Sequence, residues 1–139
     1  MKWKWIAFGL VLVGLGALVK IANTPPPALS VEEQAREVKF RAASGGALTL
    51  RQQMRDPESF RVASAIVTPD KSVCYRYRSH NGFGGMSDGR AMIYAGMLLS
   101  KEDAAFDKVW QKECAGVVGE QTADEVMAGL RQYDKLHSY

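Results

Sequence analysis

The chain has 139 residues, of which 47% are hydrophobic and 24% charged, and this composition excludes a disordered or low-complexity protein. Three of the 18 basic residues are Lys2, Lys4 and Lys20, and beyond Ala22 the remaining 15 match the 15 acidic residues, so the net charge of +3 belongs to the first segment. The formally neutral remainder gives no case for a nucleic-acid partner, and the early lysines are typical of a membrane flank.

The segment Trp5–Val19 (WIAFGLVLVGLGALV) contains no charged side chain and is bounded by a lysine on each side. Counted from Trp3–Ala22 it reaches the length of about 20 residues that a membrane span needs. We therefore predict a transmembrane signal-anchor over residues 1–22, single-pass in the inner (cytoplasmic) membrane. The more basic N-terminal flank stays in the cytoplasm and the rest of the chain lies outside. The alternative is a cleaved signal peptide that uses Ala22 and Thr24 as its small residues.

A proline-rich segment, residues 23–29, follows the apolar one and contains Pro25-Pro26-Pro27. Successive prolines favour an extended, stiff spacer. We therefore predict a linker here, followed by an extracytoplasmic domain over residues 30–139.

Two helices are expected at the start of this domain. Ser30 and Glu33 form a capping-box pair, and Ser44-Gly45-Gly46 is typical of a helix end. A second capping pair begins at Thr49, and Asp56-Pro57 closes that short helix, because the residue before proline avoids helical angles. Apolar residues recur at helical spacing along the first helix and predict its buried face: Val31, Ala35, Val38 and Ala42.

Three strands are then expected. Residues 60–68 (FRVASAIVT) are rich in β-branched side chains, and a turn at Pro69 leads into an alternating strand that starts at Val73. A glycine-rich connection at Asn81–Gly85, with a second turn signal at Asp88-Gly89, precedes a third strand over residues 90–97. The sequence thus predicts an antiparallel, hairpin-connected sheet.

Two further capping pairs, at Ser100 and Thr122, predict helices after the sheet. The first carries Phe106, Trp110 and Cys114 on one face, and Trp110 is expected in the core. The complete order predicts an α+β domain: a small three-stranded antiparallel sheet packed with helices on one face, preceded by one N-terminal transmembrane helix.

The two cysteines, Cys74 and Cys114, have only each other as partners within the chain. A disulfide between them fits an extracytoplasmic compartment, and two free buried thiols are the alternative. We expect no metal site, because two cysteines and two distant histidines lack any ligand spacing such as C-x-x-C. No cofactor is expected.

The strand from Val73 and its glycine-rich loop hold the candidate binding residues. The glycines suit positive φ angles in a structural loop, although their amides could also cradle an anion. The strand arginines, near Arg61 and Arg90, either face solvent or bind an acidic partner. We expect Phe83 to pack inward, because a small domain has few large apolar side chains. The candidates are Tyr75, Arg76, Tyr77, Arg78, Asn81, Phe83, Gly84 and Gly85.

No catalytic residue is predicted. His80 precedes a turn, where a solvated strand end is the simplest interpretation, and no nucleophile signature such as G-x-S-x-G occurs. The sequence does not decide whether the protein is an enzyme, and two hypotheses of a binding function rank above an enzymatic one.

Four short motifs follow one another in the chain: Asp56-Pro57-x-Ser59-Phe60, Cys74-x-Tyr-x-Tyr77, Asn81-x-Phe83-Gly84-Gly85 and a tryptophan-containing helix that ends at Cys114. Together they resemble a core found in uncharacterised, short bacterial envelope-associated proteins that have no known activity. The likeness covers about Leu48 to Ala115. It implies an envelope location and transfers no catalytic or binding residues.

The first hypothesis for function is therefore a membrane-anchored, non-enzymatic interaction or accessory module that faces the periplasm or the exterior, with the membrane and another envelope protein as partners. The alternative is a domain that binds a small molecule or glycan through the aromatic and glycine-rich region of residues 75–85.

Overall fold

The structure, a computed structural model, describes residues 27–138, and from Val31 onward the chain forms one compact unit. The predicted membrane segment, residues 1–22, lies outside the described residues. Within the described part, no helix is both long and apolar enough to cross a membrane.

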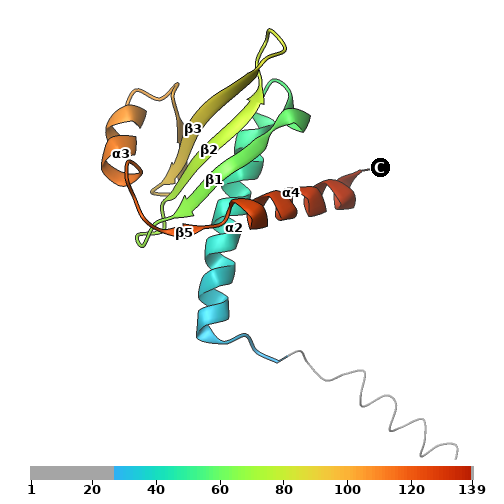
Figure 1. Cartoon of the computed structure of the whole chain (residues 1–139). Coiled ribbons are helices and arrows are strands. Elements are labelled where there is room, and N and C mark those ends of the chain that lie inside the picture. The colour runs from blue at the N-terminus through green and yellow to red at the C-terminus, as the bar shows by residue number, and fades with distance from the viewer. Residues whose placement is uncertain (1–26, 139) are drawn as a thin grey trace, which may run out of the picture. The chain divides into compact units, whose positions relative to one another are not determined.

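The domain is α+β, but its sheet has five strands where the sequence analysis predicts three. The strands are antiparallel neighbours in the order β4-β3-β2-β1-β5, with the helices packed around them (Figure 1). The elements are α2 (Val31–Gln52), η1 (Pro57–Ser59), β1 (Arg61–Val67), β2 (Val73–His80), β3 (Met86–Tyr94), β4 (Met97–Ser100), α3 (Phe106–Glu113), β5 (Glu120–Gln121) and α4 (Ala123–His137).

The prediction of three strands is wrong because residues 90–97 do not form one strand. Ala95 and Gly96 both have positive φ angles, 49° and 77°, which is the backbone of a tight two-residue hairpin turn. The chain therefore reverses between Tyr94 and Met97, and β4 pairs back onto β3. The short β5 adds to the other side of the sheet, where Gln121 is the register partner of Ile66.

The first helix also differs from the prediction, because α2 continues through Gly45 and Gly46 without ending. Gly46 is buried against the sheet: a Cβ there would lie 2.5 Å from Tyr75 Oη and 2.8 Å from Ile93 Cγ1. Thr49 does not cap a second helix, since its hydroxyl donates to the Gly45 carbonyl one turn back (3.0 Å). The glycines serve close packing within a helix, where the sequence analysis predicts a helix end.

The predicted buried stripe of α2 is displaced by this extension. Val31 and Val38 are 84% and 58% exposed, and burial begins only at Ala43. The buried positions of α2 are Ala43, Gly46, Ala47 and Leu50, which recur at helical spacing over its second half.

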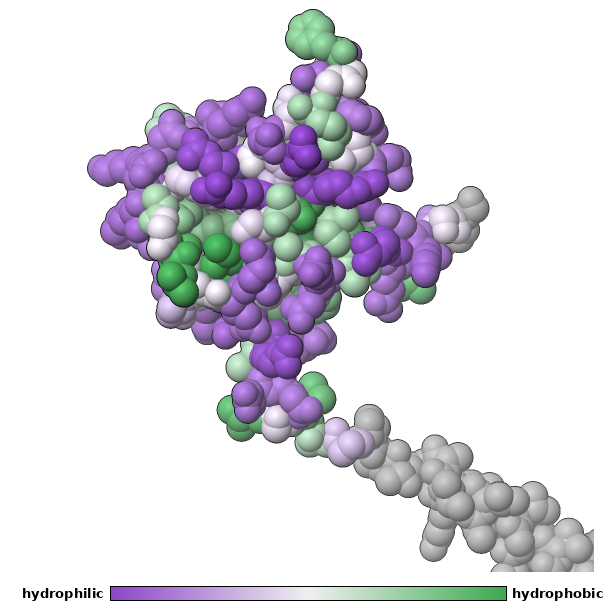
Figure 2. Space-filling view, in the orientation of Figure 1, coloured by the Kyte–Doolittle hydropathy of each residue, from purple (hydrophilic) through white to green (hydrophobic). Residues whose placement is uncertain are grey.

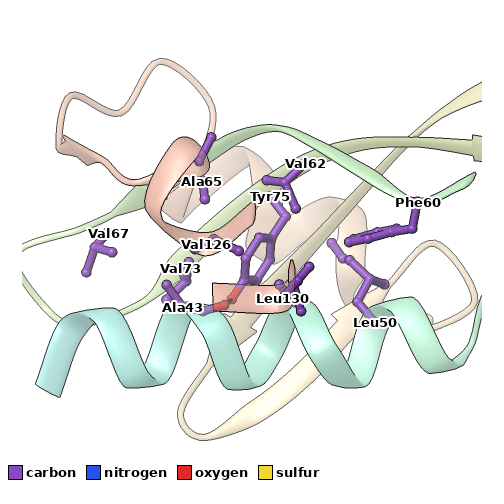
Figure 3. Packing of buried hydrophobic residues seen from close by; sticks show 13 residues of the cluster. Ala43, Leu50, Phe60, Val62, Ala65, Val67, Val73, Tyr75, Val126 and Leu130 are labelled. Carbon is purple, nitrogen blue, oxygen red and sulfur yellow. Dashed lines mark hydrogen bonds between the residues drawn. The ribbon is translucent and has the colours of Figure 1, made fainter. Parts of the chain in front are cut away.

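The helices cover both faces of the sheet, not one face as the sequence analysis expects. On one face α2 and α4 enclose the larger core, in which Tyr75 lies between the helices and its hydroxyl donates to the Ala43 carbonyl (2.6 Å; Figure 3). On the other face α3 packs Phe106 and Trp110 over Met92 and Cys74. This division follows from strand alternation, because successive residues of β2 point to opposite faces.

The predicted disulfide is confirmed. Cys74 on β2 and Cys114 at the end of α3 are bonded, with their Cα atoms 5.7 Å apart. The bond closes a loop whose ends are 40 positions apart in sequence. It fixes α3 to the sheet face that α2 and α4 do not cover.

The turn predicted at Pro69 is confirmed as the connection between β1 and β2. Lys71 N donates to the Thr68 carbonyl (3.0 Å), and Val67 and Val73 are register partners. The second turn signal, Asp88-Gly89, is not a turn, because both residues lie within β3. Glycine at position 89 allows the Tyr77 ring to lie close to the backbone of β3, since a Cβ there would be 2.3 Å from that ring.

Candidate functional site

The β2–β3 hairpin loop, residues 81–85, is held in one shape by Asn81. Its side-chain oxygen accepts hydrogen bonds from the backbone N–H groups of Phe83 (2.9 Å) and Gly85 (3.1 Å), and its amide nitrogen donates to Ser87 Oγ (2.9 Å). Asn81 N also donates to the Gly85 carbonyl (2.8 Å). Gly84 supplies the positive φ angle, +82°, that the turn requires.

Phe83 is 99% exposed, so the expectation that it packs inward is wrong. The hairpin tip projects beyond the rest of the domain, with apolar atoms at its end (Figures 1 and 2). All five loop residues are exposed, so no buried core lies beside the loop for a phenyl ring to enter. The loop therefore presents an aromatic side chain on a hydrogen-bonded backbone.

The two strand tyrosines have different environments. Tyr75 is completely buried, and this burial raises the pKa of its hydroxyl well above the ordinary value. Tyr77 is partly exposed, and burial raises its pKa, with a smaller contribution from the negative charge of Glu102. Tyr75 is thus a core residue, whereas Tyr77 can contact a ligand.

Tyr77 forms part of a cleft of about 760 Å³ at the end of the sheet that carries the hairpin. The C-terminal turn of α2, the end of β2, the start of β3 and the segment after β4 form its walls. Its lining mixes apolar, polar and charged side chains. It consists of Leu50, Gln53, Met54, Arg55, Tyr77, Ser79, His80, Asn81, Ser87, Asp88, Gly89, Leu98, Ser100, Lys101, Glu102 and Asp103.

His80, at the rim of this cleft, is paired with Asp56: Nδ1 lies 2.7 Å from Asp56 Oδ2, and this hydrogen bond lowers the pKa of the carboxyl. Ser59 is close, but its hydroxyl donates to the Asp56 carbonyl and accepts from the His80 backbone N–H, so it does not contact the imidazole. Both side chains of the pair are more than 40% exposed. This geometry lacks the nucleophile–base contact that nucleophilic catalysis requires.

On the sheet face that α3 packs against, the arginines of β1, β2 and β3 form the cross-strand set that the sequence suggests. Arg61 is the register partner of Arg78, and Arg76 is the register partner of Arg90. Arg78 pairs with Asp88 (3.2 Å). Like charges directly opposite each other repel, and the carboxylate of Asp88 offsets part of this repulsion.

Two members of the set have further contacts. The guanidinium of Arg90 lies 5.3 Å from the Trp110 ring centroid, a cation–π distance, and 3.7 Å from the exposed carboxylate of Asp107. Arg76 is exposed and makes no ion pair with any residue from 27 to 138. Both arginines line a second hollow of about 430 Å³, together with Ala63, Tyr77, Asp88, Gly89, Lys101 and Phe106.

Of the candidate residues, Tyr77 and Asn81 line the larger cleft, Arg76 lines the smaller hollow, and Phe83 and Gly84 form the tip. Nothing in the sequence identifies Gln53, Met54 or the segment Lys101–Asp103 as cleft residues, because helix and strand ends carry no local signal of the distant residues they meet. Among residues 27–138, no three histidine, cysteine or acidic side chains lie close enough together to hold a metal ion.

Comparison of the chain with protein-family models, curated proteins and solved structures gives no match. The resemblance to short bacterial envelope proteins therefore stays a prediction from the sequence, and the function has to be argued from the geometry.

Proposed function

We propose that the protein is a membrane-attached interaction module that binds another envelope protein through the tip of its β2–β3 hairpin. The observation that carries the proposal is Phe83, 99% exposed on a loop whose backbone is held by Asn81. Large aromatic side chains are frequent anchors of protein interfaces, where they enter a pocket of the partner.

The energetics favour this interpretation. Burying a phenyl side chain is worth about 1.5–3 kcal/mol relative to leaving it in water, so an exposed Phe83 is an unused source of binding free energy. A loop that is already ordered loses little conformational entropy on binding. The hydrogen bonds of Asn81 therefore support affinity although its side chain need not touch the partner.

The position of the tip within the domain also fits. The first turns of α2 lie beside Val67 and Lys71, at the β1–β2 turn, whereas Gly82 of the tip lies beside Arg55, just beyond the end of α2. The chain thus enters the domain at one end of the sheet, and Phe83 projects from the other. A tether at Val31 leaves the hairpin tip free to meet a partner.

Membrane attachment and the compartment belong to the same proposal and rest on the sequence. The apolar segment Trp5–Val19 is flanked by lysines, and the proline-rich linker separates it from the domain. The Cys74–Cys114 disulfide fits an oxidising compartment.

The test is site-specific photo-cross-linking of the full chain in its own membranes. A photoreactive phenylalanine analogue replaces Phe83 in one variant and Val118, which is 90% exposed outside the hairpin, in the control. We expect a discrete protein adduct from position 83 that position 118 does not give. Identical adducts from both positions, or lipid adducts alone, would overturn the proposal.

A positive result is then quantified with the purified partner. Phe83→Ala should weaken binding about ten-fold or more, as loss of an interface anchor does, while the melting temperature of the protein stays the same. Unchanged affinity would show that the tip is near the partner without contributing to binding.

The cleft of 760 Å³ favours a second candidate function, binding of a small polar ligand such as a sugar. Tyr77 offers an aromatic surface beside the polar side chains of Gln53 and Asn81. In a titration followed by nuclear magnetic resonance, a saccharide ligand should shift the signals of these residues and leave Phe83 unaffected. Shifts confined to the hairpin tip would exclude this candidate.

A further inference from the structure

Within residues 27–138, the part of β3 nearest the hairpin has an open outer side. Strand β4 pairs only with Ala91–Tyr94, so Met86–Gly89 have β2 on one side and no strand on the other among residues 27–138. After Ser100 the chain turns away: Ser100 N donates to Asp103 Oδ2 (2.7 Å), and Asp103 N donates to the Ser100 carbonyl (2.9 Å). Because of this turn, β4 does not continue as a strand paired with Met86–Gly89.

The backbone of this edge presents hydrogen-bonding groups outward. Asn81 N donates to the Gly85 carbonyl, so Gly85 faces β2 with its backbone groups. In an antiparallel ladder such positions alternate, so Ser87 and Gly89 also face β2 while Met86 and Asp88 direct their N–H and C=O groups to the outer side. These groups are a template for a further strand.

The opposite edge of the sheet shows how an edge is closed in this protein. On β1, Ala65 N donates to the side chain of Gln121 (2.7 Å), and the Ala65 carbonyl accepts from Thr122 N (2.8 Å). Further along β1, Val62 N points at the sulfur of Met127 on α4 (3.3 Å). The β3 edge has no comparable cover from any residue between 27 and 138.

Both hollows described above flank this open edge, one on each face of the sheet. The larger cleft and the smaller hollow share Tyr77, Asp88, Gly89 and Lys101. Side chains of an added strand would point alternately to the two faces and so into the two hollows. Recognition by strand addition works in this way: the backbone bonds give affinity, and pockets for alternate side chains give specificity.

The two hollows differ in chemistry, and the difference specifies the ligand. On the α3 face the hollow contains three cations, Arg76, Arg90 and Lys101, and one carboxylate, Asp88, which is paired with Arg78. Arg90 and Lys101 lie 3.7 Å and 3.9 Å from the exposed carboxylates of Asp107 and Glu102, whereas Arg76 makes no ion pair within residues 27–138. That face suits acidic side chains.

On the other face, the larger cleft has apolar surface from Met54, Leu98 and the ring of Tyr77. An apolar side chain of the added strand would be removed from water there.

We propose that the β3 edge binds an extended peptide segment of the partner protein, in which apolar and acidic residues alternate, as an additional strand. The inference rests on the proposed function in taking this end of the domain as the binding end. It adds a second contact with the partner, distinct from Phe83, and it specifies the kind of partner sequence that binds there.

The test uses the full chain in lipid nanodiscs and a capped hexapeptide that alternates leucine and glutamate, with an alternating leucine–lysine hexapeptide as the control. Titration followed by nuclear magnetic resonance should shift the amide signals of Met86 and Asp88 with the acidic peptide only. Equal shifts with the basic peptide, or shifts confined to other strands, would overturn the proposal.

A matched pair of variants tests the backbone contact. Asp88→Ala keeps the outward N–H group and should bind the acidic peptide as well as the wild type or better, because a negative charge is removed. Asp88→Pro removes that N–H group, which edge strands tolerate, and should bind about ten-fold more weakly than Asp88→Ala. Equal binding by the two variants would exclude strand addition.

Two additional measurements keep the result interpretable. If Asp88→Pro does not fold, N-methylated hexapeptides take its place with the wild-type chain: methylation at one alternate set of amides should abolish binding and at the other set should not. Phe83→Ala should leave peptide affinity within about two-fold, since it removes no edge contact. Failure at the edge with an intact effect of Phe83 on the partner would reject this inference alone.

Discussion

The two ends of β2 differ in how they are covered. One end, called the stapled end here, contains the Cys74–Cys114 disulfide. At this end Val73, Cys74 and Tyr75 are all buried, because α2 and α4 cover one face and the disulfide-linked α3 covers the other. At the hairpin end, Arg78 and His80 are exposed, and the connection to β3 carries an aromatic side chain entirely in water. One strand thus passes from a core that is closed on both faces to a surface with two hollows and an open edge.

This difference in coverage between the two ends of β2 indicates where a small domain can place a binding surface. The disulfide and a core that extends to Leu50 and Phe60 stabilise the domain, so the exposed apolar and polar groups of the hairpin itself contribute little to folding. Regions of low local stability commonly carry binding function for this reason.

The sharpest test of this comparison is a pair of phenylalanines. Phe106, 1% exposed in the core between α3 and the sheet, should cost about 3–5 kcal/mol of unfolding free energy when it is replaced by alanine, as large-to-small core changes do. Phe83→Ala at the hairpin end should stay within about 0.5 kcal/mol. Urea unfolding of both variants measures the difference, and equal losses would show that the two ends do not differ as described.

The disulfide gives the next largest expected effect. Cys74→Ala and Cys114→Ala should each lower the unfolding free energy by about 2–4 kcal/mol, because the unfolded chain loses the closure of a long loop. The double variant should be little worse than either single one, since both changes remove the same bond. Losses that add fully would contradict a shared bond, and reduction of the wild-type protein provides the control.

Adjacent glycines of α2 provide a smaller effect with opposite signs. A Cβ on Gly46 meets Tyr75 and Ile93 at less than 3 Å, so Gly46→Ala should destabilise the protein by about 1–3 kcal/mol through overpacking. Gly45 has nothing within 4 Å, so Gly45→Ala should stabilise by up to about 1 kcal/mol through helix propensity. Thermal unfolding would reveal the signs, and stabilisation by both variants would mean that α2 does not pack closely on Tyr75.

Patterns that depend on neighbours in sequence predicted single elements correctly, although the three-stranded sheet covered on one face was wrong. Alternation along Val73–Arg78 gave the strand, Pro69 gave the turn before it, and the cysteine count gave the disulfide. Each of these depends on local geometry or on elimination, which a single sequence contains.

The errors occurred where one residue type serves two purposes. Gly46 and Gly89 suggested a helix end and a turn, yet both are glycine because Tyr75 and Tyr77 lie against them. That close approach is a tertiary property. The two hollows were equally inaccessible to prediction, since each forms only where distant segments meet. The larger lies between α2, β3 and the segment after β4, and the smaller lies between the strands β1, β2 and β3 and the start of α3.

The Cys74–Cys114 disulfide also determines what happens when the chain is cleaved by a protease. Residues 101–105, between β4 and α3, are exposed and irregular, which is the kind of segment that proteases cleave. The cut would fall between Cys74 and Cys114, so the two fragments would remain joined through sulfur, and α3 could not diffuse away from the sheet. A molecule nicked there would keep its fold and separate into two pieces only when reduced.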